Sequence, residues 1–176
     1  MINLMEGKRG LVIGVANERS IAWGIANVLA KHGAEFAITY QTASFEKRVR
    51  PLAESIGSKL ILPADVQDEQ SLKIVFDKLQ KNWRKLDFLV HAIAYSDKEE
   101  LVGSFINTSR SNFSNSLDIS CYSLIDLSRR AVPLMKDGGS IVTLTYMGSQ
   151  RVTPNYNVMG VAKAALESTV RYLAND

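Results

Sequence analysis

The sequence lacks several features that would point to whole classes of protein. Cys121 is the only cysteine among 176 residues, which excludes a disulfide framework and a cysteine metal site. No apolar stretch approaches the length that spans a bilayer, and residues 1–10 contain no apolar run of signal length. No dense block of lysine and arginine accompanies the net charge of +3. We therefore expect a cytoplasmic protein that binds neither membranes nor nucleic acid.

The sequence also offers few residues that could hold a metal ion. His32 and His91 have no partners at metal or catalytic-triad spacing, and neither HExxH nor CxxC occurs. His91 ends an apolar run, so we expect a core histidine whose polar atoms are satisfied. Cys121 is expected to be a small buried helix residue. The sequence therefore predicts no metal site.

Short apolar runs alternate with helical patterns along the whole chain. The composition, 46% hydrophobic and 22% charged, is that of an ordinary globular protein, and the length suits one domain over residues 1–176. Strands are expected over residues 9–15, 35–40, 59–63, 86–92 and 140–146. Helices are expected over residues 20–31, 44–56, 69–83, 109–135 and 154–173.

This alternation indicates βαβ units and a parallel sheet. The strands are apolar on both faces, as they are when helices cover both faces of a sheet. Right-handed crossovers then favour an α/β fold of the Rossmann type, a doubly wound parallel sheet with the strand order 3-2-1-4-5. Ligands of this fold bind beyond the carboxyl ends of the strands.

The turn after the first strand carries a candidate phosphate site. Gly14 ends the strand, but the turn is longer than GxGxxG and carries side chains. Ser20 stands at the N-cap position of the following helix, where its hydroxyl and the helix amides could hold a pyrophosphate. Gly24 would permit close packing of helix and strand. A plain strand–turn–helix junction with a serine cap explains the same residues equally well.

The next two strands also end in polar residues. Gln41 follows the second strand and can hydrogen-bond a ribose, and no arginine or lysine follows at once to meet a 2′-phosphate. This favours NADH over NADPH. After the third strand, Asp65 could accept from an adenine amine while Val66 packs on the ring. Aspartate is also common in turns that begin a helix, so the structural explanation stays open.

Tyr156 and Lys163 follow the fifth strand with six residues between them. Seven positions along a helix are almost two turns, so the two side chains should share one face. A phenol beside a lysine cation suits a developing enolate oxygen. A tyrosine and a lysine on a solvated helix face are the alternative, and the place of the pair after the fifth strand favours a site.

Taken in order, these motifs resemble the bacterial NADH-dependent enoyl-[acyl-carrier-protein] reductases, a divergent branch of the short-chain dehydrogenases. The resemblance covers essentially the whole chain. It rests on residues 14–17, 19–24, 41, 65–66, 91–94, 146 and the spacing Tyr156-x6-Lys163.

The resemblance implies roles for the cofactor-binding residues. It places Gly14, Ser20 and Ile21 at the pyrophosphate of the cofactor. It also implies that Gln41, Asp65 and Val66 contact the adenosine half, that Ile93 lies near the cofactor, and that Lys163 binds the nicotinamide ribose.

The resemblance likewise implies the substrate side. Tyr156 would hydrogen-bond the thioester carbonyl as it becomes an enolate, and Tyr146 would line the pocket as a further catalytic residue. The backbone near Tyr95 and Ser96 would approach the substrate. Hydride would pass from NADH to the β-carbon of a trans-2-enoyl thioester on acyl carrier protein during fatty-acid synthesis. A homotetramer is implied as well.

Two features depart from the family. Residues 91–94 read His-Ala-Ile-Ala, where the family usually has a serine and a glycine. The sequence stops at Asp176, whereas the family continues with further strands and helices, so C-terminal strands are expected to be missing. The fifth strand would then be an edge of the sheet.

Two other functions remain open. A 3-oxoacyl-thioester reductase or another short-chain alcohol dehydrogenase would usually carry Tyr-x3-Lys, but Met159 stands four residues before Lys163. A catalytically inactive cofactor-binding fragment is the second alternative, and cofactor-dependent turnover would distinguish it from the enzyme.

Overall fold

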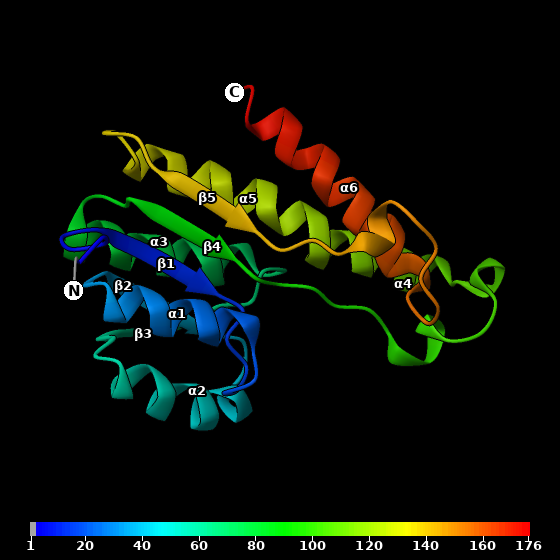
Figure 1. Ribbon diagram of the computed structural model, residues 1–176, viewed down its shortest axis with the longest axis horizontal. Coiled ribbons are helices and arrows are strands. Elements are labelled where there is room, and N and C mark those ends of the chain that lie inside the picture. The colour runs from blue at the N-terminus through cyan, green and yellow to red at the C-terminus, as the bar shows by residue number, and fades with distance from the viewer. Residues whose placement is uncertain (1–2) are drawn as a thin grey trace. The chain divides into compact units, whose positions relative to one another are not determined.

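A computed structural model describes residues 3–176, and these contain one five-stranded sheet and six α-helices (Figure 1). The strands are β1 Arg9–Ile13, β2 Glu35–Tyr40, β3 Leu60–Pro63, β4 Phe88–His91 and β5 Ser140–Thr143. The α-helices are α1 Ile21–Lys31, α2 Ala43–Ser55, α3 Glu69–Trp83, α4 Arg110–Leu117, α5 Ser123–Ala131 and α6 Asn157–Leu173. Short 3-10 helices are η1 Lys98–Leu101, η2 Phe105–Asn107, η4 Val132–Leu134 and η5 Met147–Ser149, and η3 Asp118–Tyr122 is a π-helical turn.

The sheet has the predicted order. Its strands run β3-β2-β1-β4-β5, and all four neighbouring pairs are parallel. The prediction of a Rossmann-type sheet is therefore confirmed. The expected end of the fifth strand at Tyr146 is wrong, because β5 stops at Thr143 and the segment that carries Tyr146 is free of the ladder.

The chain divides into two compact units. Unit 1 comprises the described part of Met1–Ala92 together with Ser128–Thr143, and unit 2 comprises Ile93–Leu127 together with Leu144–Asp176. The expectation of a single dinucleotide-binding domain over residues 1–176 stays a prediction. Throughout residues 3–176, no helix is both long enough and apolar enough to cross a bilayer.

Unit 1 consists of the sheet and the helices that cover it. Val12, Ile38 and Val90 point to one face, where they pack with buried alanines of α1 and α2. Because side chains alternate along a strand, Leu11 and Leu89 point to the other face. Both are fully buried, and α3 lies behind the sheet as α1 and α2 lie in front (Figure 1). Helices thus cover both faces, as the apolar strands predicted.

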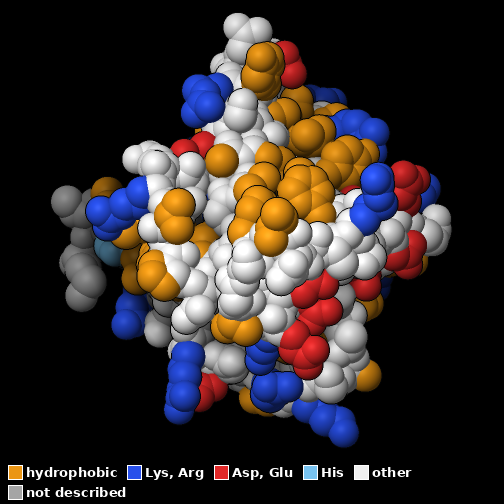
Figure 2. All heavy atoms as spheres, turned by 90° about the vertical axis from the view of Figure 1, so that its right-hand side faces the viewer, with side chains coloured by type: hydrophobic (Ala, Val, Ile, Leu, Met, Phe, Trp, Pro, Cys, Tyr) orange, Lys and Arg blue, Asp and Glu red, His pale blue; other side chains and the backbone are white. Residues whose placement is uncertain are grey.

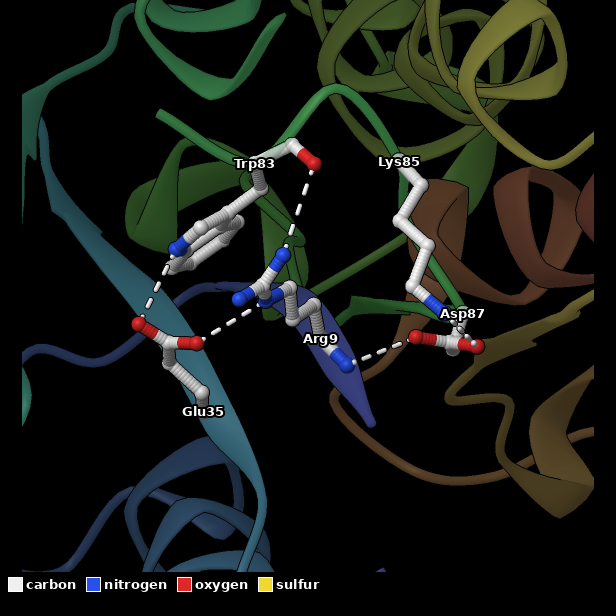
Figure 3. Close-up of polar contacts among 5 residues, drawn as sticks. All are labelled: Arg9, Glu35, Trp83, Lys85 and Asp87. Carbon is white, nitrogen blue, oxygen red and sulfur yellow. Dashed lines mark hydrogen bonds and ion pairs between the residues drawn. The ribbon is translucent and has the colours of Figure 1, made fainter. Parts of the chain in front are cut away.

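A polar network closes the amino-terminal edge of this sheet (Figure 3). The Arg9 guanidinium donates to Glu35 at 2.9 Å, and the Trp83 indole donates to the second oxygen of the same carboxylate at 3.1 Å. The Arg9 amide donates to Asp87 at 2.8 Å, and Lys85 lies 3.6 Å from that carboxylate. The network joins β1, β2, α3 and the start of β4. It lies at the edge opposite the carboxyl ends of the strands.

The long helix expected over residues 109–135 is interrupted in the structure. The π-helical turn η3 separates α4 from α5, and the 3-10 turn η4, with Pro133 inside it, ends the segment. Proline has no amide proton to donate, which explains the tightened end. Cys121 lies in η3 and is 8% exposed, so its expected burial is confirmed.

Helix α6 begins later than the sequence predicted. The expected start was residue 154, but the first helical residue is Asn157 and Tyr156 is the N-cap. Asn155 and Asn157 have φ angles of 57° and 32°. Asparagine tolerates this left-handed region, and the positive φ of Asn155 prevents a regular α-helix from starting at residue 154. Tyr156 therefore precedes the helix instead of lying on it.

Candidate functional site

Three of the predicted cofactor residues lie at one edge of the sheet in unit 1. Gly14 follows β1, Gln41 follows β2, and Asp65 comes two residues after the end of β3. The carboxyl ends of parallel strands meet at the same edge, so these residues gather there. Their gathering at one edge is confirmed, and their role in binding a cofactor stays a prediction.

Gly14 makes a close backbone approach. Its φ angle is 112°, and a Cβ atom at this position would lie 2.1 Å from the carbonyl oxygen of Ala92, just after β4. No side chain larger than hydrogen fits there. The expectation that Gly24 provides close packing is wrong, because Gly24 is exposed and a Cβ atom there would meet nothing within 4 Å.

These two glycines give a matched pair of substitutions. Gly14→Ala should lower the free energy of unfolding by about 2 kcal/mol, because the turn must move and φ is strained. Gly24→Ala should raise it by about 0.5–1 kcal/mol, because alanine is favoured inside an exposed helix. Urea unfolding measures both values. Equal stability of the two variants would contradict the close approach at Gly14.

Ser20 holds the turn between β1 and α1, although not as a helix cap. Its backbone occupies the N-cap position, but its hydroxyl accepts from the amides of Ala16 and Asn17, each at 3.0 Å. The predicted N-cap position is therefore confirmed, but the alternative of a serine that caps the helix through its side chain is wrong, because the long turn folds back onto the hydroxyl. Ile21 begins α1 and is 68% exposed, and the first turn of this helix contains no acidic residue.

Gln41 and Asp65 are brought together, with the Gln41 amide 3.3 Å from the Asp65 carboxylate. The other carboxylate oxygen of Asp65 accepts from the backbone amide of Gln67 at 3.0 Å, so Asp65 also forms the turn before α3. Val66 is half-buried beside it. Both explanations of Asp65, a ligand-facing acid and a turn residue, are compatible with this geometry.

Tyr146 and Tyr156 lie together in unit 2. Their ring centroids are 5.0 Å apart, with the rings edge to face at 62°. A Cβ atom at Gly148 would lie 2.5 Å from the Tyr156 ring, so this glycine lets the ring rest on the backbone. Burial, followed by the proximity of Tyr146, raises the pKa of Tyr156 above its ordinary value. Its phenol is thus protonated at neutral pH and can donate a hydrogen bond.

Lys163 is a buried lysine on α6. It is 5% exposed, and its ammonium donates to the carbonyl oxygen of Leu144, just after β5, at 2.7 Å. Burial lowers the pKa of Lys163 from its ordinary value. A lysine so fully removed from water, with a carbonyl oxygen orienting it, is costly to stability and is typical of a functional position.

The segment after β4 carries the other two predicted residues. Ile93 is half-buried, and the Ser96 hydroxyl donates to the Asn112 side chain of α4 at 3.3 Å.

The predicted site residues form two groups, one in each unit. Gly14, Ser20, Ile21, Gln41, Asp65 and Val66 belong to unit 1, and Ile93, Ser96, Tyr146, Tyr156 and Lys163 belong to unit 2.

Glu167 is a residue of this region that sequence reasoning missed. It lies one turn after Lys163 on α6 and accepts from the hydroxyls of Thr145 at 2.7 Å and Ser149 at 2.5 Å. These two hydroxyls flank Tyr146, so Glu167 fastens the Tyr146 segment to the helix. No signal in the sequence marks this contact, because the partners lie 22 and 18 residues away.

The Glu167 carboxylate should make the stability of this segment depend on pH. The hydrogen bonds from Ser149 and then Thr145 lower the pKa of Glu167. The stabilisation is therefore complete above the unfolded-state pKa, about 4.3, and is lost as pH falls through the lower folded-state value. Glu167→Gln should lower the melting temperature at neutral pH, with a difference that shrinks below about pH 4. Thermal melts followed by circular dichroism test this, and a difference independent of pH would contradict it.

A cleft of about 450 Å³ opens beside Tyr156 in unit 2. Its apolar lining includes Phe105, Val152, Val161 and Ala164. Figure 2 views the side that carries η1, η2 and the segment before α6, and hydrophobic side chains gather there. Val152 is 98% exposed and Phe105 is 48% exposed. Tyr156 therefore borders apolar surface that remains open to solvent.

The histidine expected in the core is there. His91 is 1% exposed, and its Nδ1 lies 2.8 Å from the Thr143 hydroxyl on the neighbouring strand. Across residues 3–176, no group of three or more histidine, cysteine, aspartate or glutamate side chains is arranged to hold a metal ion.

The strand order, the glycine turn after β1 and the Tyr156–Lys163 pair after β5 define a Rossmann-type protein of the short-chain dehydrogenase class. The model of the enoyl-(acyl carrier protein) reductase family matches residues 14–176. The chain belongs to this family.

Similar proteins of known sequence and structure carry the name of the same reductase. The chain is 56% identical over 173 residues to the NADH enoyl-[acyl-carrier-protein] reductase FabI of Rickettsia typhi, and it covers 66% of that protein's length. The enoyl-(acyl-carrier-protein) reductase of Anaplasma phagocytophilum, solved with NAD, superposes with a TM-score of 0.98 at 55% identity, over all of this chain and 67% of that one. The Bacillus cereus enoyl-acyl carrier protein reductase, solved with NADP+ and indole naphthyridinone, has a TM-score of 0.96 at 44% identity, over all of this chain and 69% of that one.

Proposed function

We propose that the chain is an NADH-dependent enoyl-[acyl-carrier-protein] reductase, which reduces the trans-2 double bond of enoyl thioesters in fatty-acid synthesis. The observation that carries the proposal is the Tyr156 phenol, which packs against Tyr146 at an open apolar cleft and is followed on α6 by the buried Lys163. Membership of the family supports it.

The residues of unit 1 fit the adenosine and pyrophosphate parts of a dinucleotide. The Gly14 turn and the start of α1 offer backbone amides with no acidic side chain in the first helical turn, which suits an anion. Gln41 and Asp65 together offer both donors and acceptors to a ribose and an adenine. NADH, when bound, would supply the hydride for the β-carbon of the substrate.

The side chains near Gln41 favour NADH over NADPH. A 2′-phosphate needs a cation directly after the second strand, and residues 41–46 contain no arginine or lysine. Arg48 lies over the Phe45 ring, 5.2 Å from its centroid, and Arg50 pairs with Glu46 and Glu54. The NADH-dependent relative from Rickettsia typhi supports the same preference.

In unit 2, Tyr156 would donate its phenolic proton as a hydrogen bond to the thioester carbonyl oxygen. That oxygen gains negative charge when hydride reaches the β-carbon, so the bond is strongest in the transition state. Lys163 would bind the nicotinamide ribose, and its positive charge would support the developing enolate. A proton delivered to the α-carbon would complete the reduction.

The short-chain alcohol dehydrogenase alternative has less support. Met159, which stands where that class carries its tyrosine, is 5% exposed and cannot act as an acid. A catalytically inactive cofactor-binding fragment predicts NADH binding without turnover, which the assay below resolves.

The partners follow from this function. We propose that the substrate arrives on acyl carrier protein, an acidic protein that suits the net charge of +3. We also propose that the protein is cytoplasmic and forms a homotetramer. The exposed apolar side chains of unit 2, Val152 and Ile106 among them, support association with further copies of the chain.

The test is NADH consumption with a trans-2-enoyl thioester as substrate. We expect NADH oxidation that requires the double bond, with slower oxidation of NADPH. The saturated thioester is the matched control, and a 3-oxoacyl thioester tests the dehydrogenase alternative. Absence of turnover with NADH and the enoyl thioester would overturn the proposed activity of this chain.

A further inference from the structure

The π-helical turn η3 contains a fully buried hydroxyl. Ser120 lies in the middle of this turn and has no exposed surface. An α-helix continuing through residues 118–122 would direct this side chain elsewhere, because each added residue rotates the helix by about 100°. π-turns inside helices occur frequently at functional sites. The π-helical turn between α4 and α5 therefore directs the Ser120 side chain to its buried position.

The Ser120 hydroxyl pairs with both backbone groups of one residue. It accepts from the Tyr95 amide at 3.0 Å and donates to the Tyr95 carbonyl oxygen at 3.2 Å. It also lies 3.8 Å from the Met159 sulfur on α6. A single oxygen atom thus fixes the orientation of both peptide groups of Tyr95.

This clamp acts on a segment with no regular structure of its own. Residues 92–97 belong to no helix or strand. The next two residues are held by Asn112, whose side-chain oxygen accepts from the Ser96 hydroxyl at 3.3 Å and the Asp97 amide at 3.0 Å. Asn112 lies on α4, so two side chains from one continuous helical stretch hold three successive residues.

We propose that Ser120 is a positioning residue, which fixes the Tyr95 backbone so that the segment bordering the enoyl thioester keeps one conformation. This inference rests on the proposed function, because it concerns the same substrate. The hydroxyl itself is enclosed and touches no reacting atom. Its effect is carried by Tyr95, and the contact with Met159 couples the clamp to the helix that follows Tyr156.

The experiment compares Ser120→Ala with a matched control, Ser58→Ala. Ser58 is also buried and donates to a backbone carbonyl, that of Phe36 at 2.8 Å, but it belongs to unit 1, whereas Tyr95 belongs to unit 2. In Ser120→Ala, hydrogen exchange of the Tyr95 amide should accelerate about tenfold, because its acceptor is gone. KM for the enoyl thioester should rise about tenfold, while the NADH dissociation constant changes less than about twofold. Ser58→Ala should change none of these.

Ser120→Thr keeps the hydroxyl and should restore slow exchange at Tyr95. Ser120→Thr also serves as the test if Ser120→Ala does not fold. The KM of Ser120→Thr for the enoyl thioester should stay near that of the unaltered protein. An unchanged rate of hydrogen exchange at the Tyr95 amide in Ser120→Ala would show that Ser120 does not hold the Tyr95 backbone. Faster exchange with an unchanged KM would overturn the positioning role. If the proposed function is wrong, the unaltered protein shows no turnover with the enoyl thioester. Hydrogen exchange at Tyr95 still tests, independently of turnover, whether Ser120 holds the Tyr95 backbone.

Discussion

Tyr156→Phe should lower kcat for enoyl thioester reduction by about two to three orders of magnitude and leave the NADH dissociation constant within about twofold. The reason is the loss of one hydrogen bond, aimed at the carbonyl oxygen where negative charge develops. Phenylalanine keeps the ring that packs edge to face against Tyr146 and rests on Gly148. The variant therefore removes a proton donor without disturbing the packing.

Steady-state kinetics and NADH titration of the same preparation measure both quantities. Tyr172→Phe is the matched control, because it removes the same hydroxyl from a tyrosine that is 77% exposed near the end of α6. It should change neither kcat nor NADH affinity. If Tyr156→Phe kept more than about a tenth of kcat, the phenol would not be the principal stabiliser of the enolate oxygen.

The architecture could be predicted because it depends on local patterns. Apolar runs such as residues 9–13 and 35–40 alternate with amphipathic segments, and right-handed crossovers convert this alternation into one strand order. The same topology brings residues after β1, β2 and β3 to one edge of the sheet, where Gln41 and Asp65 were both expected, and their side chains lie 3.3 Å apart. Neither result requires knowledge of individual side-chain contacts.

The element ends that were wrong depend on individual backbone angles. Asn155 and Asn157 both adopt positive φ, which delays α6 to residue 157, and asparagine permits this conformation without requiring it. The Ser20 hydroxyl in the turn before α1 likewise takes partners that the residue type does not determine. A serine at an N-cap position usually caps the helix, but here the preceding loop is long enough for two of its own amides to reach the Ser20 hydroxyl.

The contacts that hold the segments carrying Tyr146 and Tyr95 could not be predicted at all. Glu167 fastens residues on both sides of Tyr146, and Ser120 holds Tyr95 across 25 residues of sequence. Such contacts form only after the chain has folded, and serine, threonine and glutamate on a helix give no pattern that separates them from solvated residues. The candidate site residues were therefore identifiable from motif spacing, whereas the residues that hold their segments in place were not.

Lys163→Met should weaken NADH binding about a hundredfold and at the same time stabilise the fold. In its proposed role the ammonium would donate a charge-assisted hydrogen bond to the ribose, and losing a bond of about 1.5–3 kcal/mol would lower the affinity. Stability rises because a buried charge is replaced by an apolar side chain of similar length. Lys163 is 5% exposed, and burial lowers the pKa of its ammonium, so the folded state bears a desolvation cost.

The pH dependence distinguishes this explanation from a simple improvement in packing. A lysine whose folded-state pKa is lowered binds its proton more weakly in the folded protein than in the unfolded chain, where the pKa is about 10.4. Unfolding then takes up protons between the two pKa values, so the unaltered protein should gain stability as pH rises through that window. The advantage of Lys163→Met should be largest at neutral pH and should shrink toward pH 10 or so.

Thermal melts across this pH range and fluorescence titration with NADH measure both effects. Lys73→Met provides the control, since Lys73 is an exposed lysine of α3 paired with Asp77 and should alter neither NADH affinity nor the pH dependence. A hundredfold loss of affinity together with a raised melting temperature means that the fold tolerates the lysine at a cost to stability because the cofactor requires it. Unchanged NADH affinity would exclude the ribose role, and a lowered melting temperature would mean that the bond to Leu144 outweighs the desolvation of the ammonium.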